Sequence, residues 1–194
     1  MFKHGSRRIG VAVLALAAAG ALSACDPAAD PAPAASTPPS AASTASPAKT
    51  STPQVLGPDG YGALKLGMTP AQADATGLAA PFTGISDGCG RVSHLIGSPT
   101  ADGTAGSVYH SGKLGVAAIY AVPGVKTPEG VQLGTTFAEL KKAYPSWKAV
   151  DGDTEDGRGY VKVPGSTNAN YRIVVSGGTV SELDIQFVNQ DCYE

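Results

Sequence analysis

The chain has 194 residues, with 14 Lys and Arg against 16 Asp and Glu and a net charge of −2 at pH 7. This length allows one domain or two small ones. The first 24 residues hold three basic residues and no acid, so 11 basic and 16 acidic residues remain after them, a net charge of −5. Such a mildly acidic chain without a basic stripe argues against nucleic acid or anionic lipid as the main partner.

The N-terminus has the pattern of a bacterial export signal. Three basic residues precede an apolar run, Ile9 to Leu22, whose 14 residues are too few to span a bilayer permanently. The run ends in Leu22-Ser23-Ala24-Cys25, which resembles the lipobox, where a diacylglyceryl group is added to the Cys and the signal is cut before it. We therefore expect a signal peptide over 1–24 and lipidation of Cys25. The acyl chains would hold the protein at the extracytoplasmic face of the cell membrane, and the paired arginines leave the export route open.

A segment rich in Ala, Pro, Ser and Thr follows the lipobox. Residues 26–53 contain seven prolines and no aromatic residue. A segment of this composition cannot bury enough apolar surface to offset its ordering entropy. We expect 25–53 to be a disordered tether that carries a folded domain over 54–194.

The domain contains an internal repeat. Leu66-Gly67-Met68-Thr69-Pro70-Ala71-Gln72 recurs as Leu133-Gly134-Thr135-Thr136-Phe137-Ala138-Glu139. Each copy contains T-x-x-[QE], the capping box in which Thr caps the first helical turn and Gln or Glu reaches back. The spacing predicts short helices from Thr69 to Gly77 and from Thr136 to Pro145, in repeats of about 60–124 and 125–194.

Strands are expected after each helix, because β-branched and aromatic runs stand between turn residues. In Val180 to Val188, Leu183, Ile185 and Phe187 alternate with Glu182, Asp184 and Gln186, which predicts one buried and one wet face. The sequence therefore predicts an α+β fold of two tandem repeats, each a short helix packed on an antiparallel β-meander. The expected strands are Arg91–Ile96, Ser107–Ser111, Leu114–Val122, Tyr160–Val163, Tyr171–Ser176 and Val180–Val188.

Two cysteines remain once Cys25 is lipidated. Outside the cytoplasm, an even number of remaining cysteines predicts disulfide bonding, here one bond between Cys89 and Cys192. On the chain-entropy model a bond closing about 100 residues contributes roughly 4–5 kcal/mol.

The duplicated helix and meander behind a lipobox resemble small secreted actinobacterial proteins, and by architecture the β-lactamase inhibitory protein and the barrel-assembly outer-membrane lipoprotein family. The resemblance covers about 54–194. In the inhibitory protein each repeat has its own disulfide, whereas here one cysteine falls in each repeat, and no contact residue carries over. The resemblance implies that the outer face of the sheet binds other proteins.

Aligning the two hairpins places Ile119 opposite Ile185. Tyr120 then shares the wet face with Asp184 and Gln186, and a tyrosine beside acceptors suits a protein-contact surface. The alternative is an ordinary cross-strand pair on a solvated sheet.

Other chemistry-bearing patterns are weaker. Gly84-Ile85-Ser86-Asp87-Gly88 matches G-x-S-x-G, but no buried strand precedes it and no helix follows. His94 and His110 stand 16 residues apart without a further His or Cys at ligand spacing. The acidic loop Asp151–Gly157 either holds calcium weakly or is a solvated hairpin end. We expect no catalytic site, no cofactor and no metal centre.

These observations predict a lipid-anchored, extracytoplasmic protein-binding or scaffolding module without catalytic activity. The alternatives left open are an inhibitor of a secreted or envelope enzyme, a cell-envelope enzyme with an unrecognised site, and calcium-dependent adhesion.

Overall fold

The computed structural model describes residues 55–83, 89–98, 104–152 and 155–192. The chain divides into two units, 1–47 and 48–194, and all the described residues belong to the second. The predicted signal peptide, Cys25, the whole predicted tether and the G-x-S-x-G motif lie outside the described residues. Within those ranges no helix is long and apolar enough to cross a membrane.

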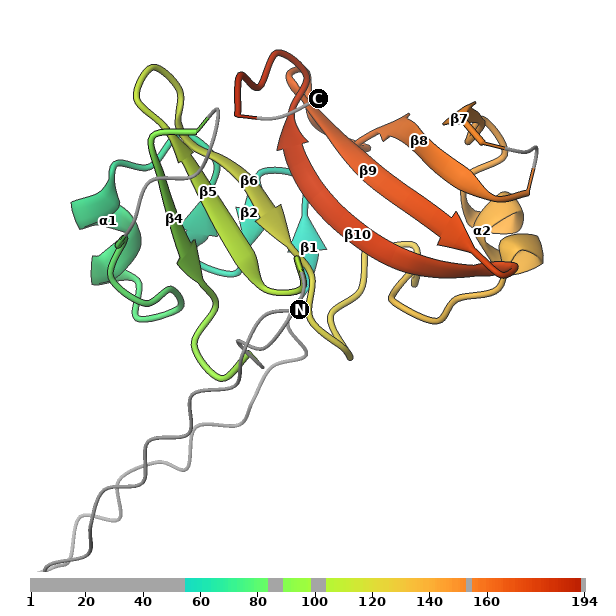
Figure 1. Ribbon diagram of the computed structural model, residues 1–194, viewed down its shortest axis with the longest axis horizontal. Helices are drawn as coiled ribbons and strands as arrows, with labels where there is room; N and C mark the ends of the chain where they lie inside the picture. Colours follow the sequence, from blue (N-terminus) through green and yellow to red (C-terminus); the bar gives the residue numbers. More distant parts are fainter. Residues whose placement is uncertain (1–54, 84–88, 99–103, 153–154, 193–194) are drawn as a thin grey trace, which may run out of the picture. The chain divides into compact units, whose positions relative to one another are not determined.

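The domain is built on two antiparallel sheets (Figure 1). The small sheet has the order β1-β2-β3 and the large sheet the order β4-β5-β6-β10-β9-β8-β7. Two short helices, α1 (Pro70–Ala75) and α2 (Phe137–Ala143), complete the described elements. The strands are β1 Leu56–Gly57, β2 Gly60–Tyr61, β3 Leu64–Lys65, β4 Arg91–His94, β5 Ser107–Ser111, β6 Gly115–Tyr120, β7 Ala149–Asp151, β8 Gly157–Lys162, β9 Ala169–Ser176 and β10 Thr179–Phe187.

The expected α+β fold, with a helix on a separate meander in each repeat, is wrong. The described chain is mostly β: α1 and α2 have six and seven residues and bury one side chain each, Ala73 and Leu140. The strands of both halves form one sheet, because β6 pairs with β10. This pairing satisfies backbone groups that two separate meanders would leave at open edges. The small sheet was not predicted, since two-residue strands are too short to give an alternation signal.

Both helix starts are confirmed, each with a complete capping box. The hydroxyl of Thr69 accepts from the backbone N–H of Gln72 at 3.4 Å, and the Gln72 side chain accepts from the Thr69 N–H at 2.9 Å. Thr136 and Glu139 make the same reciprocal bonds at 3.3 and 3.1 Å. Local side-chain chemistry therefore fixes where both helices begin.

The register predicted for the two central strands is also confirmed. Ile119 of β6 lies directly opposite Ile185 of β10, and Tyr120 lies opposite Asp184. One face of the large sheet carries the main core, which the small sheet and both helices cover. Fully buried members of that core on the sheet include Val108, Ile119, Tyr171, Ile173, Leu183 and Ile185.

Both edges of the large sheet are protected from pairing with another strand. Beside β4, the chain at 78–83 binds the edge through Ala80 N–H to His94 O at 2.8 Å and Thr83 N–H to Val92 O at 3.2 Å. At the other edge, β7 has three residues and a register irregularity between Ala149 and Asp151. Short, irregular edge strands resist edge-to-edge association, so the faces of the sheet are left as its contact surfaces.

Candidate protein-contact face

The face of the large sheet opposite the main core is the candidate site. Successive side chains of a strand point to opposite faces, so the register assigns its members. We define this outer face by the following residues: Tyr109 on β5, Ala118 and Tyr120 on β6, Glu182, Asp184 and Gln186 on β10, Asn170, Arg172 and Val174 on β9, and Arg158, Tyr160 and Lys162 on β8.

The pairing aligns these residues in two rows across the sheet. The first row runs Tyr160, Arg172, Asp184, Tyr120 from β8 to β6. The second row runs Lys162, Asn170, Gln186, Ala118, Tyr109 from β8 to β5. Each row therefore joins residues far apart in the sequence into one continuous strip.

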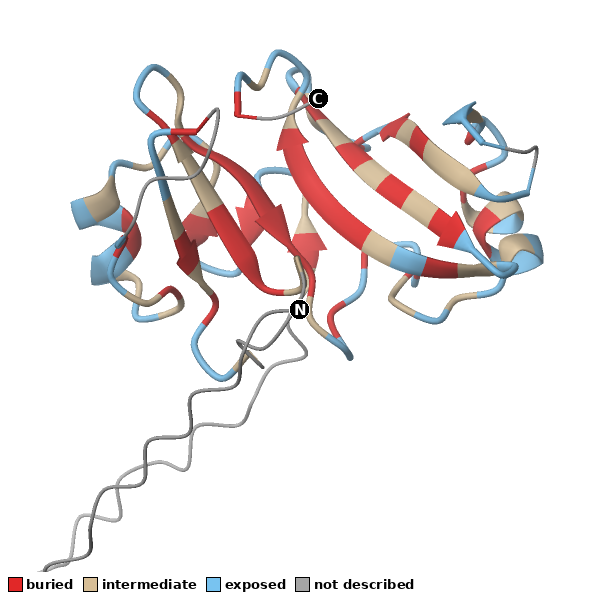
Figure 2. Cartoon of the chain, viewed as in Figure 1, coloured by how far each residue is buried: buried red, intermediate tan, exposed pale blue. Residues whose placement is uncertain are grey.

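The structure places Tyr120, Asp184 and Gln186 on the outer face as predicted, but the expectation that they are wet is wrong. Asp184 is 0% exposed, and Tyr120 and Gln186 are each 4% exposed. Figure 2 shows β10 buried along consecutive residues in its middle, whereas buried and intermediate residues alternate along β9. These three side chains have almost no accessible surface for a partner to contact. Their predicted role as protein contacts stays a prediction, and their burial argues against it.

The larger side chains beside them explain the burial. The ring of Tyr109 meets the ring of Tyr120 edge-on, with centroids 5.6 Å apart, and the guanidinium of Arg172 lies 5.9 Å from the centre of the Tyr120 ring. Both neighbours are themselves half-buried. Alternation along one strand predicts the face of a residue but not whether long side chains of the next strands cover it.

Arg172 is the electrostatic centre of the outer face. Its Nη1 donates to Glu182 Oε2 at 2.7 Å, and it lies directly opposite the buried Asp184. Burial alone would lower the pKa of Arg172, but the hydrogen bond with Glu182 and the negative charges of Asp184 and Glu182 raise it above its ordinary value. Arg172 therefore stays charged, with Glu182 bound to it and the negative charge of Asp184 nearby.

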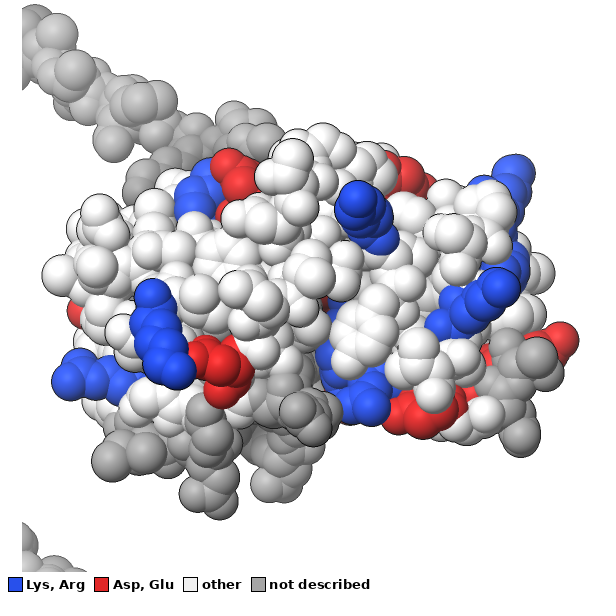
Figure 3. Space-filling model, turned by 90° about the horizontal axis from the view of Figure 1, so that it is seen from above, with Lys and Arg blue, Asp and Glu red and all other residues white. Residues whose placement is uncertain are grey.

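Charged residues are spread out over the side of the domain that Figure 3 shows from above. Figure 3 shows Lys and Arg in small groups, several of them beside Asp or Glu, with uncharged surface between them. On the outer face itself Arg158 Nη2 binds Asp151 Oδ2 at 2.9 Å, while Lys162 is exposed. The face is therefore mixed in charge and carries aromatic rings.

The predicted disulfide is present. Cys89 and Cys192, separated by 103 positions, are bonded, with Cα atoms 4.1 Å apart. They form a small buried cluster with Ala117, against which Tyr109 packs. The bond therefore lies at the β5–β6 end of the outer face.

The two histidines are not brought together as a pair. In the β4–β5 ladder His110 lies opposite Arg91 and His94 lies opposite Ser107. The His110 ring meets Phe82 with centroids 5.7 Å apart, and burial lowers the pKa of His110. In the described ranges no three or more His, Cys, Asp or Glu side chains gather as metal ligands.

Two described acids of the loop 151–157, Asp151 and Asp156, have structural partners. Asp151 accepts from the backbone N–H of Arg158 at 2.8 Å, in addition to its ion pair with that side chain. Asp156 accepts from the backbone N–H of Gly178 at 3.1 Å. Residues 153 and 154 lie outside the described residues. The loop is thereby tied to β8 and to the turn before β10.

Two shallow grooves lie near α2. One, of about 600 Å³, is formed by the loop 129–135 and α2, and the other, of about 540 Å³, lies beside Phe137, Trp147 and Lys148. At the first groove Tyr144 donates to Glu129 at 2.5 Å, and burial raises the pKa of Tyr144 and of Tyr171. Both tyrosines are buried in the main core.

The sequence reasoning missed Arg172, Tyr160 and Tyr109 as outer-face residues. The signal was present for Arg172, because β9 alternates Asn170, Arg172 and Val174 with the buried Tyr171 and Ile173. Assigning Tyr160 to the same face as Arg172 requires the register between β8 and β9. The sequence of a single strand does not give that register.

Comparison with known proteins assigns no family to the chain. No protein-family model matches it, and neither a curated protein nor a solved structure does.

Proposed function

We propose that this chain is a lipid-anchored, extracytoplasmic protein-binding or scaffolding module without catalytic activity. In this proposal the lipid on Cys25 holds it at the cell membrane, the segment 26–53 spaces the domain from the bilayer, and the outer face over β8, β9 and β10 binds a partner protein. The anchor is supported by the order of basic residues, apolar run and lipobox.

The observation that carries the binding proposal is the makeup of the outer face. Tyrosine and arginine are over-represented at the energetic centres of protein interfaces. Here Tyr160 and Arg172 stand side by side in one row, and both are partly accessible.

Preorganisation supports the same proposal. The guanidinium of Arg172 is fixed by Glu182 and by the ring of Tyr120, so its side chain has little freedom left to lose. A surface whose side chains are already ordered loses less entropy when a partner binds.

The test is site-specific photo-cross-linking of the full chain in its native envelope. A photoreactive amino acid at Tyr160 probes the outer face, and the same amino acid at Lys142, exposed on α2 at the opposite side of the sheet, is the matched control. We expect an adduct of one size from position 160 and none of that size from position 142.

A second variant makes the result specific to the face. Asn170 is half-buried between Lys162 and Gln186 in the second row, so Asn170→Arg places a long side chain on the contact surface. The adduct from position 160 should be lost in Asn170→Arg and retained in Lys142→Glu. Identical adducts from both positions, or none from position 160, would reject the proposal.

A further inference from the structure

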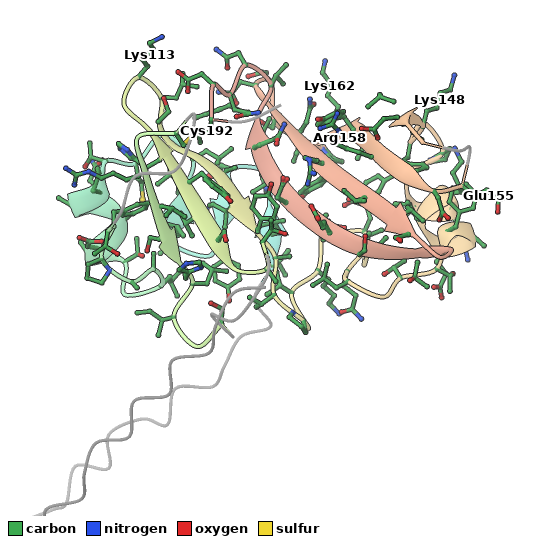
Figure 4. The ribbon with its side chains drawn as sticks, in the orientation of Figure 1. Lys113, Lys148, Glu155, Arg158, Lys162 and Cys192 are labelled. Carbon is green, nitrogen blue, oxygen red and sulfur yellow. A yellow bond between two sulfur atoms is a disulfide. The ribbon has the colours of Figure 1, made fainter. Side chains whose placement is uncertain are left out.

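The outer face is covered at one end by the chain's own C-terminus. β10 ends at Phe187, and the segment 188–192, which we name the C-terminal strap, leads to Cys192 and its bond with Cys89. Figure 4 places Cys192 at the ends of β5 and β6, near the turn that carries Lys113. Asp191 of the strap lies 3.9 Å from Lys113, in agreement with that view.

A bulge in β6 makes room for the strap. Tyr109 of β5 lies opposite Ala118, whereas His110 lies opposite Val116, so Ala117 is an extra residue on β6. Ala117 and Ala118 are both fully buried, and Ala117 contacts the two cysteines. Two adjacent methyl side chains leave the space above the sheet that the disulfide fills.

The disulfide is the covalent attachment of the strap, and at its other end the backbone N–H of Val188 donates to Asn168 O at 2.9 Å. The backbone N–H groups of Gln190 and Cys192 donate to Phe187 O at 3.2 Å and to Gln190 Oε1 at 2.7 Å, both within the end of β10 and the strap. The ion pair of Asp191 with Lys113 joins side chains that are 38% and 87% exposed, and such pairs contribute little. The disulfide is therefore the bond that joins the cysteine end of the strap to the cluster with Ala117.

We infer that the C-terminal strap is a built-in occluding element that occupies the β5–β6 end of the outer face. The strap thereby confines the contact surface for a partner to β8, β9 and β10. This consequence rests on the proposed function, but the occlusion itself does not. Release of the strap makes Ala118 and Tyr109, at the β5–β6 end of the second row, accessible. The accessible part of that row then has an apolar end.

The experiment measures tyrosine exposure in the full chain carrying Cys25→Ser, labelled with 3-fluorotyrosine. A soluble paramagnetic agent broadens the fluorine signal of each tyrosine according to its accessibility. The chain with the native disulfide is compared with the same chain carrying Cys89→Ala and Cys192→Ala. We expect the broadening of Tyr109 to rise several-fold, with Tyr160 unchanged as the accessible control and Tyr171 unchanged in the main core.

An unchanged Tyr109 in the double-alanine chain, with Tyr171 still protected, would overturn the inference. If Tyr171 also becomes accessible, the loss of the bond has loosened the whole fold, and the second variant decides. Ala117→Gln keeps the disulfide but fills the place where the bond packs, so Tyr109 alone should become accessible; no change there overturns the inference. The fluorine signals do not depend on a bound partner. The test of the occlusion and the cross-linking test at position 160 can therefore give opposite results, and failure of one does not imply failure of the other.

Discussion

Arg172 and Asp184 lie directly opposite each other on β9 and β10, and the Arg172 guanidinium also binds Glu182 at 2.7 Å. The pair sits at the centre of the sheet between two tyrosines of the same row, Tyr160 and Tyr120. Its acid is fully buried, so the two charges depend on each other.

Arg172→Met should lower the free energy of unfolding by about 3 kcal/mol, because it removes the ion pair with Glu182 and also the positive charge opposite the fully buried Asp184. Urea denaturation measures this loss. Glu182→Gln is the matched control: its side chain is 34% exposed, and we expect about 1 kcal/mol or less. Arg172→Met and Asp184→Asn combined should recover part of the loss. Equal effects of Arg172→Met and Glu182→Gln would contradict the central role of the buried pair.

The disulfide should stabilise the domain chiefly through the unfolded state. Cys89 and Cys192 close a loop with a separation of 103 positions, for which the chain-entropy model gives about 4–5 kcal/mol. The measurement compares chemical denaturation of the oxidised chain with that of Cys89→Ala and Cys192→Ala combined. A difference below about 1 kcal/mol would mean that the loop is already constrained in the unfolded chain.

Thr136→Ala should destabilise the domain by about 1 kcal/mol, because it removes the hydroxyl that caps α2. Thr69→Ala in the equivalent box of α1 is the matched variant. Thermal denaturation followed by circular dichroism reports both. No loss in either variant would show that tertiary packing alone fixes the helix starts.

The two capping boxes should differ in their pH dependence. The hydrogen bonds with Thr136 hold the pKa of Glu139 below its ordinary value of 4.5. Because the folded-state pKa is the lower one, the stabilisation by Glu139 is present above pH 4.5 and is lost as the pH falls through the lowered pKa. Gln72 of the other box does not titrate. Glu139→Gln should therefore flatten the acid side of the stability curve, which acid titration of the melting temperature checks, while an unchanged slope would contradict it.

Gly159→Ala should destabilise the sheet by about 1–3 kcal/mol, as overpacking does. A Cβ at this position would lie 2.6 Å from Trp147 Nε1 and would also press on the carbonyl of Lys148. Gly112→Ala in the β5–β6 turn is the control, because a Cβ there meets no atom within 4 Å. Denaturation midpoints of the two variants give the comparison, and similar midpoints would place the strand pairing of β8 in doubt.

The lipid anchor has a direct test. Cys25→Ser should move the protein from the membrane fraction to the soluble fraction, since no acyl chain can then attach at that position. Fractionation followed by mass analysis of the N-terminus measures it, with Cys192→Ser as a control that keeps the anchor. Recovery of Cys25→Ser in the membrane fraction would contradict lipid anchoring at this residue.

The elements that sequence patterns predicted well are those governed by near neighbours. The capping boxes at Thr69 and Thr136 involve residues three positions apart, and both form as expected. The alignment of Ile119 with Ile185 also follows from residue order along two strands. The even number of remaining cysteines was enough to predict the bond between Cys89 and Cys192.

Only the tertiary structure decided what became of the outer face. Residue order placed Tyr120, Asp184 and Gln186 on one side of the sheet, but all three are buried there, and Tyr120 packs against Tyr109 and Arg172 from neighbouring strands. Likewise, the joining of two expected meanders through β6 and β10 satisfies edge hydrogen bonds that no local pattern encodes. Short-range hydrogen bonds and side-chain period are properties of the sequence, whereas the cover over a sheet depends on contacts between distant segments.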